Sequence, residues 1–223
     1  MRNLNWDRVA AGSGILFVVL FVVAFLVPGE VPDPGDSRAK WVSYTLDKSK
    51  ELKLSAILFG LAFFAFLWFL GSLGAALREG GEPRLAAVAF GGGVTTIAVA
   101  LVSTAFQATM AWRIATNEPT LIRAFADLQF VLATMVSFSI AVFIYATAMA
   151  SWKARIFPLW YSIGSAVVAL AVLFAGGALT YKGFYAPNGG YAMITLVASL
   201  VWVLVTSVFL IKRASAAPTA APA

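Results

Sequence analysis

LSAILFGLAFFAFLWFLGSLGAAL, residues 54–77, is the stretch that decides the fold. It contains no Asp, Glu, Lys, Arg or His, and it exceeds the roughly 20 apolar residues that a helix needs to cross a bilayer. It also lacks the alternation over about 10 residues that is typical of a strand in an outer-membrane barrel. The stretch therefore predicts a transmembrane α-helix.

Five further apolar stretches of similar character follow or precede it. The six predicted spans cover residues 9–27, 54–77, 85–112, 120–151, 159–181 and 191–211. The chain has 223 residues, of which 61% are hydrophobic and 12% charged, whereas about a quarter of the residues in a soluble domain are charged. The sequence predicts an all-α membrane protein, built as a six-helix transmembrane bundle in a single domain over residues 1–213.

The first predicted span begins like a secretory signal, because Arg2 and Arg8 precede its apolar residues. Its apolar stretch is longer than a signal h-region of about 7–15 residues, and no A-x-A cleavage pattern follows it. We expect a retained helix. At the other end of the chain, the Ala- and Pro-rich tail over residues 214–223 is expected to be disordered.

The longest predicted loop, residues 28–53, begins with PGEVPDPGD at 28–36, whose three prolines exclude a helix. Asp36 or Ser37 could then cap a short helix that runs to about residues 46–49. Its Trp41 and Tyr44 would suit the headgroup zone of a membrane, which predicts a short interfacial helix. An ordinary solvated connector helix explains the same residues equally well.

Six spans place both termini on one side of the membrane, and Lys and Arg are equally numerous on the two sides. The termini side would carry Arg2, Arg8, Arg78, Arg84, Lys153, Arg155, Lys212 and Arg213. The opposite side would carry Arg38, Lys40, Lys48, Lys50, Lys53, Arg113, Arg123 and Lys182. On the termini side the basic residues sit in pairs close to helix ends, whereas most of the others share one long loop with acidic residues. We therefore predict cytoplasmic termini.

The chain has no Cys and no His, and no charged residue falls at a predicted bilayer centre. These features exclude disulfides, Cys/His zinc sites, His-ligated haem and Ser-His-Asp catalysis. Intramembrane charges usually mark proton relays and ion paths. We therefore predict no catalytic residue, cofactor or metal ligand. The net charge of +6 lies in loops and tails, where it sets topology rather than binding nucleic acid.

The strongest cluster of charges surrounds the turn between the third and fourth predicted spans. It contains Arg113, Glu118, Arg123 and Asp127. Arg123 and Asp127 are four residues apart and share one helix face. The cluster could be a vestibule that binds a polar headgroup or solute, or a structural ion pair that anchors a helix hairpin. Asp127 lies about two turns into its helix, deeper than the other charges.

A stripe of polar residues follows the same two spans. Its members are Thr96, Ser103 and Gln107 on the third span, and Thr134, Ser137 and Tyr145 on the fourth. Facing one another, they could line a small polar cavity; alternatively, they form hydrogen bonds between helices. The third span also contains Gly91, Gly92 and Gly93, which permit either a close helix contact or a local bend.

Several local motifs resemble those of a group of bacterial, actinobacterial-type integral membrane proteins whose function is unknown. They are WDRVA at residues 6–10, the Pro-Gly-Asp loop, LWFLG at 67–71, LAAVAFGGG at 85–93 and GFYAP at 183–187. The resemblance extends over nearly all the spans and implies a six-span fold in an inner membrane. It implies no activity and no functional residue.

The sequence favours a multi-pass protein of a bacterial cytoplasmic membrane that works without catalysis, in an accessory, sensory or structural role. Its partners would be the lipid bilayer and either a membrane protein or a second copy of the chain. A small transporter or channel with a neutral polar cavity is the alternative, using Gln107, Arg113, Arg123, Asp127 and Thr134. A lipid-modifying enzyme is a second alternative, disfavoured by the lack of His and of deep carboxylates.

Overall fold

The computed structural model describes residues 4–180 and 182–216, and the side chains of residues 12–180 and 182–215. All regular structure in these residues is helical. The long helices are α1 (Leu4–Leu26), α3 (Ser49–Glu79), α4 (Pro83–Thr109), α6 (Ile122–Ala154), α7 (Leu159–Ala175) and α8 (Gly190–Ala216). The short elements are α2 (Arg38–Asp47), the π-helix η1 (Met110–Ile114), α5 (Ala115–Asn117) and the 3₁₀-helix η2 (Pro119–Leu121).

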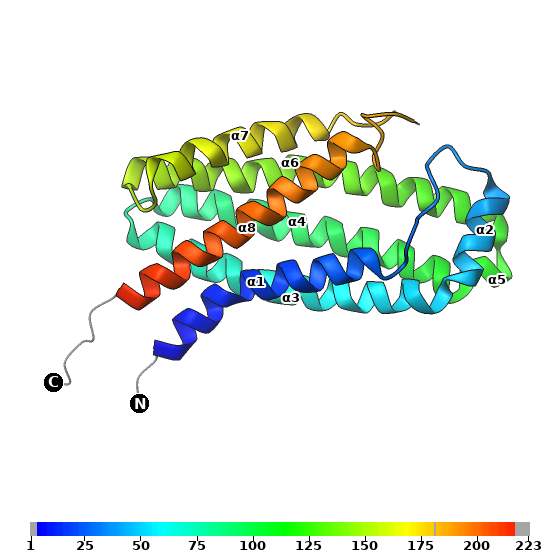
Figure 1. The fold of residues 1–223 in the computed structure, drawn as a ribbon, viewed down its shortest axis with the longest axis horizontal. Helices are drawn as coiled ribbons and strands as arrows, with labels where there is room; N and C mark the ends of the chain where they lie inside the picture. The colour runs from blue at the N-terminus through cyan, green and yellow to red at the C-terminus, as the bar shows by residue number, and fades with distance from the viewer. Residues whose placement is uncertain (1–3, 181, 217–223) are drawn as a thin grey trace.

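The six long helices run back and forth along the long axis of the molecule; α3, α4 and α6 extend farthest from the chain ends, and α1, α7 and α8 stop short of that end (Figure 1). Each packs on the next long helix along the chain, and α8 packs back on α1, so the ring is closed. α1 and α8 place the two ends of the described chain at one end of the bundle, the termini end. α2 lies at the opposite end, which we call the α2 end.

Glycine, proline and one left-handed residue make the short turns at the termini end. Gly81 has a φ of 92°, and Pro83 begins α4 two residues later. α6 ends at Arg155, whose φ of 49° lies in the left-handed region. Pro158 then precedes α7, where its fixed φ suits the start of a helix. These tight turns keep α3 beside α4 and α6 beside α7.

One face of α3 forms the centre of the core. Phe69, Leu70, Leu73 and Leu77 are each at most 1% exposed. A chain of edge-to-face aromatic contacts crosses the bundle from Phe66 of α3 to Phe143 of α6, with ring centroids 5.7 Å apart, and on to Trp202 of α8 at 5.2 Å. The fold thus joins non-consecutive helices through its middle as well as around its circumference.

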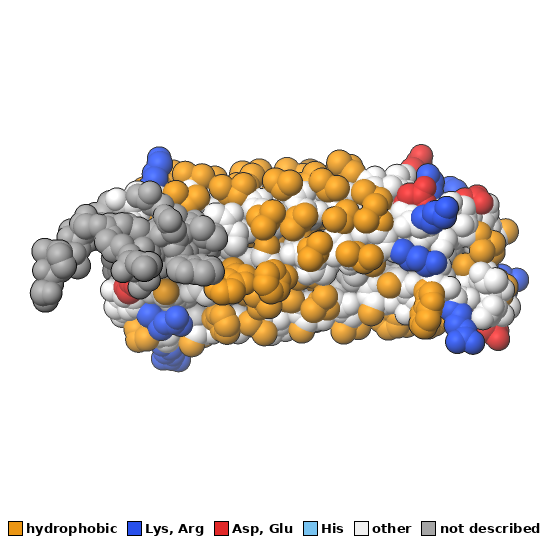
Figure 2. All heavy atoms as spheres, turned by 90° about the horizontal axis from the view of Figure 1, so that it is seen from below, with side chains coloured by type: hydrophobic (Ala, Val, Ile, Leu, Met, Phe, Trp, Pro, Cys, Tyr) orange, Lys and Arg blue, Asp and Glu red, His pale blue; other side chains and the backbone are white. Residues whose placement is uncertain are grey.

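The opposite face of α3 exposes apolar side chains, and so do its neighbours. Charged side chains gather at the two ends of the molecule, with a broad apolar belt between them (Figure 2). Such a belt would be unstable in water, and apolar exposure on this scale marks a membrane-facing surface. The helices therefore indicate a membrane-embedded protein.

Within the described residues, four helical segments are long and apolar enough to cross a membrane: 49–79, 83–117, 119–154 and 190–215. The other two apolar helices are shorter, Gly12–Leu26 within α1 and Leu159–Ala175. Spanning by all six is therefore not confirmed. The predicted fifth span, residues 159–181, is wrong at its end, because the helix stops at Ala175 before the pair Gly176-Gly177.

The end of the chain also differs from expectation. α8 continues to Ala216, so residues 214–216 of the predicted disordered tail are helical. Residues 217–223 lie outside the described residues, as does Arg2, and the side chain of Arg8 is not described.

Candidate functional site

A folded cap covers the α2 end of the bundle. It consists of residues 28–48, which comprise the Pro-rich loop and α2. Ser37 is the N-cap of α2 and its Oγ accepts a hydrogen bond from the backbone N of Lys40 at 3.3 Å, which confirms one of the two predicted caps. The prolines and the N-cap together set where the loop ends and the helix begins.

The loop closes on itself through a turn at residues 33–36. The backbone N of Asp36 donates to Asp33 O at 2.9 Å, and the backbone N of Asp33 donates to Asp36 Oδ2 at 2.8 Å. Lys40 Nζ donates to the same carboxylate at 2.7 Å. The hydrogen bond from Lys40, and then the one from Asp33, lower the pKa of Asp36, and the same bond raises the pKa of Lys40. The Asp36 carboxylate is therefore hydrogen-bonded within the turn.

Arg123 of α6 binds the turn at residues 33–36 to the bundle. Its two terminal nitrogens donate to the backbone carbonyls of Pro34 and Asp36. Its Nε donates to Asp127, with distances of 3.1 and 3.3 Å to the two carboxylate oxygens. All three guanidinium nitrogens are thus used, and Asp127 orients the group from one turn along α6.

The other members of the predicted charge cluster lie apart from this pair. Arg113 and Glu118 are exposed, and no hydrogen bond or ion pair described for residues 12–180 and 182–215 joins either of them to Arg123 or Asp127. Asp127 is itself half exposed, with 52% of its side chain accessible. The structure therefore brings together only Arg123 and Asp127 of the four residues. Through Arg123 this pair contacts the Pro-rich loop of the cap rather than the hairpin between α4 and α6.

Trp41 fixes α2 to the bundle. Its side chain is 3% exposed and packs with Met110, Ile122 and Ala126 in a small core at the α2 end. Phe130 meets it edge-on, with ring centroids 5.9 Å apart, and its indole Nε1 donates to the backbone O of Asp33 at 3.3 Å. Trp41 therefore lies inside the protein, neither in a headgroup zone nor in solvent, and both expectations for this side chain are corrected.

The helix under Trp41 departs from α-geometry. Residues 110–114 form one turn of π-helix, which continues α4 beyond its regular part. Ser49, at the start of α3, donates from Oγ to the backbone O of Ala111 in this turn at 2.8 Å. π-turns are uncommon and occur often at functional sites. No pattern in the sequence indicated this one.

An amide pair, in which Gln107 is buried and Gln129 is partly buried, lies deeper along the seam between α4 and α6. Gln129 Nε2 donates to Gln107 Oε1 at 3.2 Å, and Gln107 Nε2 donates to Leu52 O and Ser55 Oγ of α3, each at 3.1 Å. Ser55 Oγ donates in turn to Ala24 O of α1 at 2.7 Å. Four helices therefore share one hydrogen-bond network. Gln129 was not among the predicted residues, although it is the one amide side chain in its predicted span.

Three further residues of the predicted polar stripe form hydrogen bonds between or within helices. Thr96 and Ser139 share a hydrogen bond of 3.0 Å across the seam, and Ser103 donates to Gln129 O at 3.4 Å. Thr134 is buried and donates to Phe130 O, one turn earlier in its own helix. Tyr145 is 48% exposed and lies off the stripe. These bonds give the stripe a packing role in the structure as it stands.

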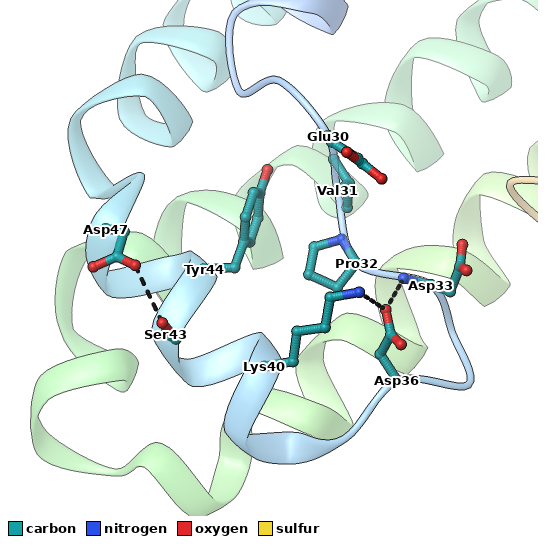
Figure 3. Close-up of a pocket in the computed structure, with 9 residues that line it drawn as sticks. All are labelled: Glu30, Val31, Pro32, Asp33, Asp36, Lys40, Ser43, Tyr44 and Asp47. Atoms are coloured by element: carbon teal, nitrogen blue, oxygen red, sulfur yellow. Dashed lines mark hydrogen bonds and ion pairs between the residues drawn. The ribbon is translucent and has the colours of Figure 1, made fainter.

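The outer surface of the cap carries a hollow of about 440 Å³ (Figure 3). Its lining residues are Glu30, Val31, Pro32, Asp33, Asp36, Lys40, Ser43, Tyr44 and Asp47. Four carboxylates and one ammonium group give it a negative balance. The loop before α8 borders the same turn, because Asn188 Nδ2 donates to Asp33 Oδ1 at 2.5 Å.

A second polar cluster lies toward the termini end, where α6, α7 and α8 meet. Tyr161 and Thr206 share a hydrogen bond of 2.7 Å, and Trp202 Nε1 donates to Ser165 Oγ at 2.7 Å. Next to them, Ser207 Oγ is buried without a hydrogen-bond partner and faces Gly14 of α1. This cluster links the helices that close the ring.

Among the described residues, no group of three His, Cys, Asp or Glu side chains is placed to hold a metal ion. Comparison with known proteins finds no matching family, no matching curated protein and no matching solved structure.

Proposed function

We propose that the protein is a non-enzymatic, multi-pass protein of a bacterial cytoplasmic membrane, in which the cap is the working surface for recognition of a membrane-protein partner. The observation that carries this proposal is the construction of the cap. Residues 28–48 are tied to α6 by Arg123, to the small core by Trp41, and to the loop before α8 by Asn188. An arrangement of this kind presents a shaped, charged surface at one end of the molecule.

The interior supports the same proposal. The amide pair and the hydroxyls along the seam between α4 and α6 are hydrogen-bonded to one another or to backbone carbonyls. Hydrogen bonds of this kind between membrane helices hold the helices together, each contributing about 0.6 kcal/mol. The charged side chains are concentrated at the ends of the bundle (Figure 2).

The distribution of charge supports cytoplasmic termini. Arg78, Arg84, Lys153, Arg155 and Lys212 all lie at the termini end, close to helix ends. At the α2 end the basic residues are mixed with acidic ones, as in the hollow of the cap. The positive-inside rule, which counts short segments near helix ends, therefore favours a cap on the outer side.

Native mass spectrometry of gently extracted protein tests the proposal. The parent should carry a second protein or form a defined homo-oligomer. That association should weaken when the cap surface is changed by Glu30→Gln together with Asp47→Asn. Glu82→Gln, a similar loss of charge at the termini end, should leave it intact. An unchanged association in the cap variant would contradict a role for the cap.

A small transporter is the second candidate, and one observation favours it. The Arg123–Asp127 pair lies at the α2 end of a seam that contains the hydrogen-bonded amides of Gln107 and Gln129. If the protein is a transporter, Asp127→Asn should change the flux of a polar solute into proteoliposomes while the fold survives. A small molecule bound at fixed stoichiometry in the mass spectrum would favour the transporter over the accessory protein.

A further inference from the structure

Trp41 packs about one helical turn from the Gln107–Gln129 pair, on the side of the α2 end. Met110, which packs against Trp41, is three residues after Gln107 on α4 and η1. Ala126, also packed against Trp41, is three residues before Gln129 on α6. Three residues is close to one helical turn, so both glutamines lie one turn below the indole. The ring therefore separates the Gln107–Gln129 hydrogen bond from the surface of the α2 end.

The helix that carries Trp41 is attached to the bundle by few apolar side chains, with Val42 and Tyr44 partly buried beside Trp41 in the small core. Of the ten residues of α2, the buried ones are Trp41 and Thr45. A helix of this length is marginal by itself, since isolated helices shorter than about 12–15 residues are unstable in water. Segments with few buried apolar contacts and many exposed hydrogen bonds open most readily.

The cap has a break in the helical path at each end. Gly29 has a φ of 71°, in a region that glycine enters freely, and it lies three residues after the end of α1. At the other end Lys48, with φ −105° and ψ 19°, interrupts the helical path between α2 and α3. Rotation at these two points would lift residues 30–47 without disturbing α1 or α3.

Arg123 is the main polar contact that would oppose such a movement. It joins two backbone carbonyls of the cap to a carboxylate of α6, so its bonds cross from the cap to the bundle. Hydrogen bonds to charged groups are stronger than those between neutral groups.

We propose that residues 28–48 form a lid over the seam between α4 and α6, with Trp41 as its stopper and Arg123 as its latch. Opening the lid admits water to Met110 and then to the Gln107–Gln129 pair. This inference goes beyond the proposed partner recognition and does not depend on it, because it concerns the movement of the cap and not what binds to it.

Cysteine labelling tests the lid, because the chain contains no cysteine of its own. A reporter is placed beneath the stopper by Met110→Cys, at a site that is 3% exposed. Its rate of reaction with a water-soluble maleimide is measured in purified protein in lipid nanodiscs. The rate should be slow in the parent and should rise about tenfold or more when Arg123→Gln removes the latch. Trp41→Ala should raise it as well.

Three matched controls accompany the reporter. Ser43→Cys, on the exposed side of α2, should react quickly whether or not Arg123 is present. Ser151→Cys, fully buried toward the termini end, should stay protected in both. Arg84→Gln removes a charge of the same sign far from the lid and should leave the Met110→Cys rate unchanged.

Two outcomes would overturn the proposal. An unchanged Met110→Cys rate in the Arg123→Gln protein, with Ser151→Cys still protected, would show that Arg123 is no latch. A parallel rise at Ser151→Cys would show that Arg123 stabilises the whole fold and that no separate lid exists.

Discussion

The backbone of Phe143 in α6 lies against Gly92 of α4 so closely that a Cβ atom on Gly92 would stand 2.9 Å from Phe143 N and 3.1 Å from Phe143 Cα. Backbone atoms cannot move aside as a flexible side chain can. Of the two interpretations of the Gly91-Gly92-Gly93 run, the structure shows the close helix contact. The pair sets the spacing of the α4–α6 seam.

Gly92→Ala should therefore destabilise the protein. Forcing a methyl group into a packed contact typically costs about 1–3 kcal/mol. Gly91→Ala is the matched control, because nothing lies within 4 Å of a Cβ atom at that position. Its effect should be neutral or slightly stabilising, since Ala favours a helix over Gly. The free energy of unfolding in a denaturing-detergent titration measures both; equal effects would contradict the close contact.

Removing the hydroxyl of Ser165 and removing that of Ser207 should have opposite effects on the stability of the protein. Ser165 Oγ accepts the indole N–H of Trp202 and donates to Tyr161 O, so Ser165→Ala leaves a buried N–H unpaired and should cost about 1–3 kcal/mol. Ser207→Ala should be neutral or stabilising, because its hydroxyl is buried without a partner. The same titration compares them, and a large loss of stability in Ser207→Ala would indicate a partner for that hydroxyl.

The Gln107–Gln129 hydrogen bond should appear as an energetic coupling between α4 and α6. In a double-mutant cycle with Gln107→Ala and Gln129→Ala, we expect a coupling of about 0.6 kcal/mol, and at most about 1.7, as for other pairs in membrane helices. Gln107→Ala alone should cost more than Gln129→Ala alone, because Gln107 also bonds Leu52 and Ser55. Additive effects would show that the two amides do not interact.

Tyr44 should lose its phenolic proton at a higher pH than a solvated tyrosine does. Burial of its ring between the cap and the bundle, with a smaller contribution from Glu51, raises its pKa to about 12, against an ordinary value of 10. The folded state holds the proton more tightly than the unfolded state does. The contribution of protonated Tyr44 to the stability of the closed cap is therefore present in full below pH 10. This contribution is lost as the pH rises from 10 through 12. The alkaline absorbance titration of the parent minus that of Tyr44→Phe gives the midpoint; an ordinary midpoint would mean that Tyr44 is solvated.

The sequence predicts features that depend on near neighbours in the chain. Long apolar runs specify the helices, Ser37 caps α2, and the spacing of four places Arg123 beside Asp127. Each follows from local geometry, which a single sequence contains. The predicted helix boundaries are least accurate where two glycines stop α7 early.

What the sequence does not predict depends on residues far apart in the chain. Arg123 bonds carbonyls 87 and 89 residues away, and backbone acceptors leave no mark in the sequence. Trp41 has the same local surroundings whether it enters a headgroup zone or a protein core. Its burial depends on Met110 and Ile122, which only the folded bundle brings to it.

The early end of α7 has a consequence for the membrane around the protein. Its 17 residues rise about 26 Å, short of the roughly 30 Å hydrocarbon thickness of a typical bilayer. Its outward face is apolar, with Ile163, Val167 and Phe174 each more than half exposed. If α7 crosses the bilayer, lipid beside it would have to compress, at a cost of fractions of a kcal/mol per Å of mismatch. The protein should favour thinner bilayers, and any neighbour that shields this edge from lipid would relieve the compression.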